Sequence, residues 1–268
     1  MPAIPDTLRQ PEARAGYLIE HFWDNLDFVN DTLSVNPDIM EQSFVNYLSV
    51  FPIANKKSRE EAIRTLVERS SDNLKAFDIV CSLAEKYFYN LDSPNYSENT
   101  YEVFIDNVIA NTKIDEVDKI RYRYHKDAIS KNRVGSAAHD FQFTDEGGKI
   151  DRLYDIETPD NLLLIFYDPD CDHCASTIRE LASDSFISSL IADKGLVVVS
   201  IYSGDDYELW VERHGDIPQI WIDGFEDGTI QEEGCYIFRT MPTIFLLNDK
   251  KEVLLKEASV EELKNFLK

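Results

Sequence analysis

The chain has 268 residues, of which 43% are hydrophobic and 29% charged, a composition typical of a folded globular protein with room for two ordinary domains. Its formal net charge of −23 disfavours binding to nucleic acids and to anionic membranes, because an acidic surface repels phosphate groups. No apolar stretch approaches the roughly 20 residues of a membrane span, and the amino end lacks the basic, apolar and small-residue order of a secretion signal. We therefore expect no nucleic-acid partner and no membrane span in this chain.

The first 132 residues carry helical signals almost exclusively. Apolar residues recur at three- and four-residue steps, and clusters of Asn, Asp, Ser and Pro separate the segments. Ser58 and Glu61 have the spacing of a capping box, which predicts the start of the third helix. The other predicted helices lie within residues 11–23, 36–51, 74–89, 101–110 and 117–129. We expect an all-α helical bundle over residues 1–132.

Strands and helices alternate over residues 133–268. Two continuous apolar runs predict strands buried on both faces, and each is followed by a predicted helix. Two hairpins flank this region, and a capping box at Ser259 and Glu262 starts a final helix. The predicted strands cover residues 141–143, 150–153, 161–167, 196–202, 243–247 and 253–255. This order predicts an α/β domain with a central mixed sheet and helices on both faces.

Two of the four cysteines, Cys171 and Cys174, form a C-x-x-C motif between the strand 161–167 and the helix after it. A helix amino terminus stabilises negative charge on a sulfur, so Cys171 is placed to act as a nucleophilic thiolate. Cys174 follows one helical turn later and can attack a mixed disulfide formed on the first sulfur. The motif predicts thiol-disulfide exchange. No cofactor is required, because the dithiol itself carries two electrons.

Two segments resemble the hallmarks of the thioredoxin superfamily. Residues 163–174, LLIFYDPDCDHC, resemble its first strand and active-site turn, and residues 240–247, TMPTIFLL, resemble the proline and strand opposite the cysteines. Residues 137–268 resemble the exported bacterial thiol-disulfide oxidoreductases of this superfamily. Residues 1–132 resemble a helical domain of unknown function that precedes such domains in exported bacterial proteins. The resemblance implies a thioredoxin-like fold and a periplasmic location.

The resemblance also implies roles for single residues. Met241 and Pro242 would be joined by a cis peptide bond, and the backbone beside them would pair with a bound substrate. His173 resembles a histidine that favours the thiolate in oxidising members. Ile165 stands where many thioredoxins carry a buried acid, and Thr177 stands where exported reductases often carry a glutamate.

Three carboxylates work against the helix terminus and His173. Asp168, Asp170 and Asp172 crowd Cys171, and like-charge repulsion disfavours a thiolate there. The opposing contributions are of similar size, each on the order of 1 kcal/mol or less at exposed positions. The sequence therefore leaves open whether the domain reduces or oxidises its partner.

Other interpretations of the cysteines remain. A structural zinc site needs four ligands, and no second cysteine pair accompanies the motif, so we expect no metal. The dithiol could instead be redox-silent in a non-catalytic interaction module whose helical domain binds the partner. Cys81 falls on a helical apolar face and is expected to be a buried hydrophobe, while Cys235 is either a packed thiol or a redox participant. The expected partners are a protein with thiols or a disulfide and a second redox protein.

Overall fold

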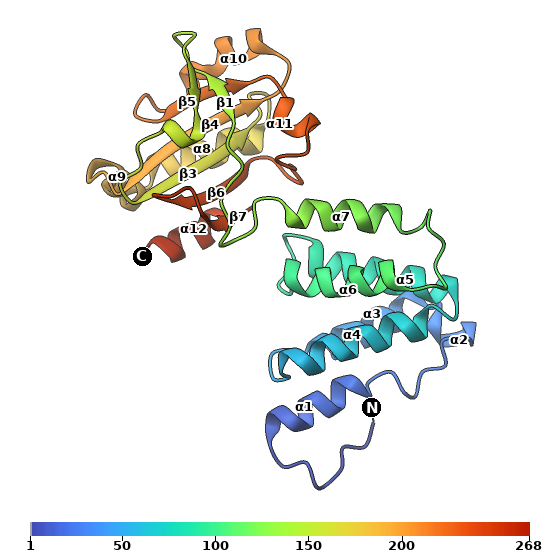
Figure 1. Ribbon diagram of the computed structural model, residues 1–268. Helices are drawn as coiled ribbons and strands as arrows, with labels where there is room; N and C mark the ends of the chain where they lie inside the picture. Colours follow the sequence, from blue (N-terminus) through green and yellow to red (C-terminus); the bar gives the residue numbers. More distant parts are fainter. Residues whose placement is uncertain (1) are drawn as a thin grey trace. The chain divides into compact units, whose positions relative to one another are not determined.

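The computed structural model describes residues 2–268 and separates into two compact units, which divide between Asp127 and Ala128 (Figure 1). The first unit is helical and the second contains a mixed sheet with helices, so the predicted fold class is confirmed. The domain boundary after residue 132 stays a prediction. Within the described residues, no helix has both the length and the apolar character needed to cross a membrane.

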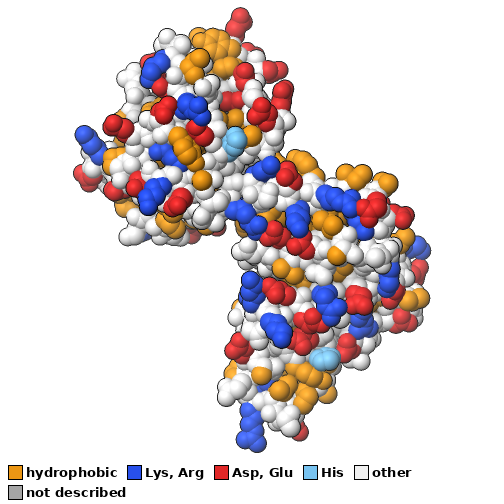
Figure 2. Space-filling view, viewed as in Figure 1, with side chains coloured by type: hydrophobic (Ala, Val, Ile, Leu, Met, Phe, Trp, Pro, Cys, Tyr) orange, Lys and Arg blue, Asp and Glu red, His pale blue; other side chains and the backbone are white. Residues whose placement is uncertain are grey.

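The helical unit is a stack of helices whose apolar faces meet. Helix α4 packs against both α1 and α6, and α3 packs against α5. On the face seen in Figure 2, lysine and arginine side chains of this unit are interspersed with acidic ones. The helices are α1 (Pro11–Glu20), α2 (Asp31–Ser34), α3 (Pro37–Leu48), α4 (Lys56–Ser70), α5 (Leu74–Ala84), the π-helical turn η1 (Glu85–Tyr89), α6 (Glu98–Ala110) and α7 (Ile120–Ser130).

The start of α4 differs from the prediction. Its N-cap is Asn55, whose side-chain oxygen accepts a hydrogen bond from the backbone N–H of Ser58 at 2.9 Å. Ser58 lies inside the helix and is buried, and a Cβ on Gly16 would stand only 2.7 Å from its hydroxyl oxygen. The capping box predicted at Ser58 is therefore wrong, because Asn is as good a capping residue and occurs three positions earlier. The capping box at Ser259 is confirmed.

The second unit is built on a seven-stranded sheet with the order β2-β1-β5-β4-β3-β6-β7. Strand β3 lies between β4, to which it is parallel, and β6, to which it is antiparallel. The strands are β1 (Gln142–Thr144), β2 (Ile150–Arg152), β3 (Asn161–Tyr167), β4 (Leu196–Ser203), β5 (Ile222–Glu226), β6 (Thr243–Asn248) and β7 (Val253–Lys256). The helices are α8 (Asp172–Ser183), α9 (Ser185–Ala192), α10 (Tyr207–Arg213), α11 (Thr229–Glu232) and α12 (Val260–Leu267), with short 3₁₀ turns η2 (Leu153–Asp155) and η3 (His214–Asp216).

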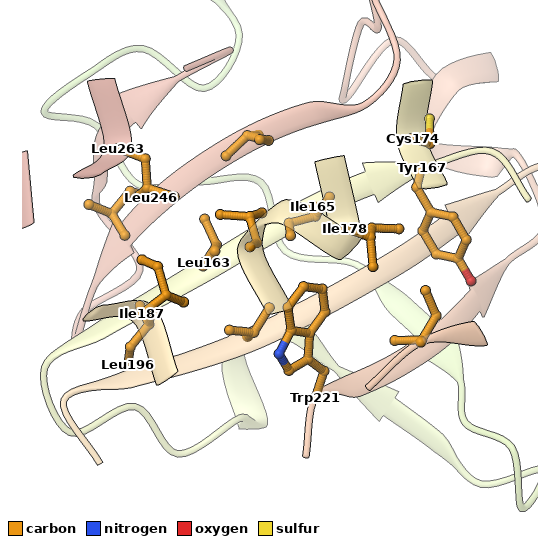
Figure 3. Packing of buried hydrophobic residues seen from close by; sticks show 14 of the residues in the cluster. Leu163, Ile165, Tyr167, Cys174, Ile178, Ile187, Leu196, Trp221, Leu246 and Leu263 are labelled. Carbon is orange, nitrogen blue, oxygen red and sulfur yellow. The ribbon is translucent and has the colours of Figure 1, made fainter. Parts of the chain in front are cut away.

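Alternate residues of β3 belong to two separate clusters, one on each face of the sheet. Leu163, Ile165 and Tyr167 pack with side chains of α8, α9 and α12 (Figure 3), whereas Leu162 and Phe166 pack in the opposite cluster. Each fully buried apolar side chain of this size contributes about 1.5–3 kcal/mol relative to an exposed one. This double burial explains the continuous apolar sequence of β3 and holds its carboxyl end, from which the cysteine loop departs, in a fixed position.

Strand β5 is an element that the sequence did not predict. It spans Ile222–Glu226 and contains two acids and a glycine, residue types that are depleted in strands, so the sequence does not indicate one here. The glycine is required by close approach, because a Cβ on Gly224 would stand 2.3 Å from the ring of Phe143. The strand pairs with β4 and completes the half of the sheet that carries β1 and β2.

Candidate functional site

The loop between β3 and α8 presents Cys171 at a helix terminus. A turn forms after Tyr167, in which the N–H of Asp170 donates to the Asp168 carboxylate at 2.8 Å and the N–H of Cys171 donates to the Asp168 carbonyl at 3.1 Å. The turn makes Cys171 the N-cap of α8, and its sulfur accepts a hydrogen bond from the N–H of Cys174 at 3.2 Å. The free N–H groups of a first helical turn favour negative charge at this sulfur.

The two thiols differ in exposure. Both are free; Cys171 is partly exposed, whereas Cys174 is fully buried at the end of the α8-side cluster beside Tyr167 (Figure 3). Burial raises the pKa of the Cys174 thiol to about 12, and its hydrogen bond with Cys171 raises it further, while the backbone N–H of Asp168 lowers it. Cys174 is therefore a protonated, shielded thiol at neutral pH, and Cys171 is the sulfur that an incoming molecule can reach.

The segment that precedes β6 lies beside the cysteines. The Met241–Pro242 peptide bond is cis, and Thr243 pairs with Phe166 near the carboxyl end of β3. His173, on the first turn of α8, donates from Nδ1 to the carbonyl oxygen of Met241 at 3.1 Å. The structure therefore brings Cys171, Cys174, His173 and Met241–Pro242 to the same end of β3, from positions about 70 residues apart in sequence. Local sequence patterns alone could not have shown that these residues meet.

Of the acidic residues expected near Cys171, Asp170 and Asp172 are exposed and Asp168 is partly buried. Asp170 projects from the turn and Asp172 is the first residue of α8, where a carboxylate is stabilised by the helix dipole. Ile165 and Thr177, the two departures from the family pattern, are buried.

A partly buried carboxylate that sequence reasoning missed lies near this site on β5. Asp223 accepts hydrogen bonds from Ser200 Oγ at 2.7 Å, Trp210 Nε1 at 2.9 Å and the Tyr167 hydroxyl at 3.1 Å. Burial raises the pKa of Asp223 to about 6, although these three hydrogen bonds lower it. The sequence signal that could have indicated this partly buried position is a single acid with Trp221–Ile222 before it and a Gly-Phe pair after it.

The remaining cysteines lie elsewhere. Cys81 is fully buried in the helical unit, as expected, and burial raises its pKa to about 12. Cys235 is partly buried against the cluster on the sheet face opposite to Cys174, and its thiol donates to Glu233 Oε2 at 3.8 Å. Burial and the neighbouring Glu233 raise the pKa of Cys235. Over residues 2–268, no group of three or more His, Cys, Asp or Glu side chains could hold a metal ion.

Comparisons with known proteins agree with this architecture. Residues 1–132 match the family model described as a domain of unknown function, DUF5106. A thioredoxin-like protein from Bacteroides caccae is 34% identical with a TM-score of 0.88, and the match covers 99% of this chain and 96% of that one.

Two further solved structures each match about half of this chain. The C-terminal domain of an uncharacterised protein from Bacteroides fragilis is 32% identical with a TM-score of 0.50, over 52% of this chain and 99% of that one. The thioredoxin domain of a thiol-disulfide oxidoreductase from Bacteroides vulgatus is 19% identical with a TM-score of 0.44, over 50% of this chain and 94% of that one. No curated protein matches the chain.

Proposed function

The chain belongs to the family of thioredoxin-like proteins that includes its Bacteroides caccae relative, and we propose that it is a thiol-disulfide oxidoreductase. The observation that carries the proposal is the unequal pair of thiols. Cys171, whose sulfur is partly exposed, is the N-cap of α8. Cys174 follows one helical turn later; its thiol is buried and protonated, and its backbone N–H donates to the Cys171 sulfur at 3.2 Å.

The proposed reaction begins at Cys171. Its thiolate attacks one sulfur of a substrate disulfide, forming a mixed disulfide and releasing the other substrate sulfur as a thiolate that takes up a proton. Cys174 then loses its proton and attacks Cys171 Sγ, which forms the Cys171–Cys174 disulfide and releases the second substrate thiol. Two electrons pass from the protein dithiol to the substrate disulfide. The reverse sequence oxidises a substrate dithiol, and the relative reduction potentials set the direction.

Neighbouring groups have proposed roles in this reaction. The helix terminus stabilises the Cys171 thiolate, while the exposed carboxylates of Asp170 and Asp172 oppose it. His173 holds the Met241 carbonyl through its 3.1 Å hydrogen bond and so positions the segment against which substrate backbone would dock. The substrate is a protein with thiols or a disulfide, and a second redox protein restores the dithiol. We propose a periplasmic location together with this function, because proteins with stable disulfides, on which such an enzyme would act, occur in oxidising compartments.

A trapping experiment tests the proposal. In Cys174→Ser the resolving thiol is absent, so reaction with a disulfide-linked peptide should accumulate a mixed disulfide on Cys171, detected as an intact-mass increase equal to one peptide strand. Cys171→Ser should form no such adduct under the same conditions. Adducts on both variants at equal rates, or on neither, would contradict the assignment and favour a redox-silent interaction module.

A further inference from the structure

A cavity of about 240 Å³ lies beside the cysteine loop. One wall is Tyr167, Asp168 and Pro169, which lead to Cys171, together with Ala175, which follows Cys174. The rest of the lining comes from α8 and from the end of α10 with the turn after it, namely Ile178, Arg179, Arg213, Asp216 and Ile217. The cavity therefore borders the reactive loop without containing either sulfur in its wall.

The sheet order places this cavity on a different side of the dithiol from the proline segment. Strands β4 and β6 flank β3 on opposite sides; α10 follows β4, whereas Met241–Pro242 precede β6. A molecule whose sulfur reaches Cys171 consequently has the proline segment on one side and the cavity on the other. Groups next to the reacting sulfur are within reach of the cavity wall formed by Asp168 and Pro169.

Two of the side chains that line the cavity are exposed arginines without partners. Arg179 and Arg213 make no hydrogen bond or ion pair within the described residues, and neither carboxylate that lines the cavity, Asp168 or Asp216, pairs with them. Other arginines of this unit are engaged: Arg152 pairs with Asp140, and Arg239 pairs with Glu257. Each guanidinium presents five N–H donors in a planar arrangement that matches a carboxylate.

We propose that this cavity, the arginine cavity, binds a carboxylate of the redox substrate and makes the protein prefer acidic disulfides or thiols. The inference rests on the proposed function and names its substrate class. In a chain with a net charge of −23, long-range repulsion disfavours an acidic partner, so the preference comes from short-range pairing with Arg179 and Arg213. Two partly solvated, charge-assisted contacts correspond to a selectivity of about tenfold.

The carboxylate has two possible sources, which share this chemistry. It can be a Glu or Asp side chain beside the reacting cysteine of a protein, or a carboxylate of a small thiol such as glutathione. The test therefore uses two matched pairs of oxidised substrates. One pair is a disulfide-linked peptide with Glu or with Gln beside its cysteine, and the other is glutathione disulfide and its fully esterified ethyl ester, in which every carboxylate is masked.

The rate of oxidation of the reduced full-length protein is measured with each substrate. We compare wild type with the double variant Arg179→Gln/Arg213→Gln and with Lys250→Gln/Lys268→Gln, which removes the same charge from exposed side chains that do not line the cavity. Wild type should react about tenfold faster with the acidic member of at least one pair. The arginine variant should lose this preference and keep the wild-type rate on the neutral member, which also shows that it is folded. The lysine variant should keep the preference.

The outcomes distinguish a failure of the inferred carboxylate preference from a failure of the proposed oxidoreductase function. Preference confined to the peptide pair identifies a protein substrate, and preference confined to the glutathione pair identifies a small thiol. Equal rates on both members of both pairs, or a preference that survives in the arginine variant, would overturn the inference while leaving oxidoreductase activity intact. Absence of reaction with all four substrates in wild type would overturn the proposed function and the inference with it.

Discussion

Cys81 in the helical unit and Cys174 in the thioredoxin-like unit are both fully buried, and burial raises the pKa of each thiol to about 12. Only Cys174 has a second, partly exposed thiol one helical turn away. Cys81 is surrounded by its own helices and has no such neighbour. Burial alone therefore makes a cysteine inert, and the chemistry arises where a buried thiol is paired with an accessible one.

Four arginines, two in each unit, show a further contrast. In the helical unit Arg64 is bonded to Glu61 and Glu68, and Arg69 is bonded to Asp24. In the thioredoxin-like unit Arg179 and Arg213 have no such partners and line the same cavity. An arginine without a protein partner keeps its N–H donors available to another molecule.

Removing each cysteine should separate the two units most clearly. Cys171→Ser should reduce the rate of insulin reduction by dithiothreitol to the uncatalysed level, a loss on the order of 10³-fold or more, because the nucleophile is gone. Cys81→Ala should keep the wild-type rate, since Cys81 only fills space in the helical core. A Cys171→Ser protein as active as wild type would remove the distinction between the two units.

We expect a smaller effect from one carboxylate in each unit, Asp223 and Glu61. It concerns the change of stability with pH, and its sign differs between the two units. The folded-state pKa of Asp223 is raised from 3.8 to about 6, so the stability it contributes is complete below pH 4 and is lost as the pH rises through 6. The loss amounts to about 3 kcal/mol at 1.36 kcal/mol per pKa unit. Asp223→Asn should lack this fall when urea unfolding is measured between pH 4 and 7.

Glu61 of the helical unit provides the reverse case. Its pKa is lowered by the hydrogen bond from Arg64, so its contribution is present above its usual pKa and is lost as the pH falls. Relative to wild type, Glu61→Gln should therefore lose stability at pH 7 and converge with wild type on acidification. Unfolding profiles of Asp223→Asn and Glu61→Gln that both run parallel to wild type would contradict these opposite assignments.

The smallest expected effect concerns the arginines. Arg64→Gln removes one i,i+3 and one i,i+4 ion pair and should lower the free energy of unfolding by about 0.5 kcal/mol in low salt. Arg179→Gln removes no pair and should leave the free energy of unfolding at its wild-type value, measured by urea unfolding. A larger loss in Arg179→Gln than in Arg64→Gln would mean that Arg179 serves the fold rather than a ligand.

The elements closest to the dithiol were the most predictable from sequence. Strand β3 spans Asn161–Tyr167 as its apolar run predicted, because burial on both faces leaves a continuous signal. Strand β6 begins directly after Pro242, where the resemblance indicated it. Both segments carry their information locally, since each is specified by consecutive residues.

Features that depend on distant elements could not be predicted in this way. Asp223 is held by residues from β3, β4 and α10, and its strand was hidden by its acids and Gly224. Arg179 and Arg213 lie 34 positions apart and share a cavity only because α8 and α10 approach the same end of β3. No local pattern marks such a pair, because its spacing follows neither helical nor strand periodicity.

The most direct test of the account is a redox titration of the native protein. The protein is equilibrated in glutathione buffers of defined potential, quenched in acid, alkylated under denaturing conditions and analysed by peptide mass. The account predicts that Cys171 and Cys174 pass together from two alkylated thiols to one disulfide in a single two-electron transition, with a tenfold change in ratio per about 30 mV, while Cys81 stays alkylated throughout. Alkylation of Cys171 and Cys174 that stays unchanged across every buffer would contradict the assignment of a redox-active dithiol.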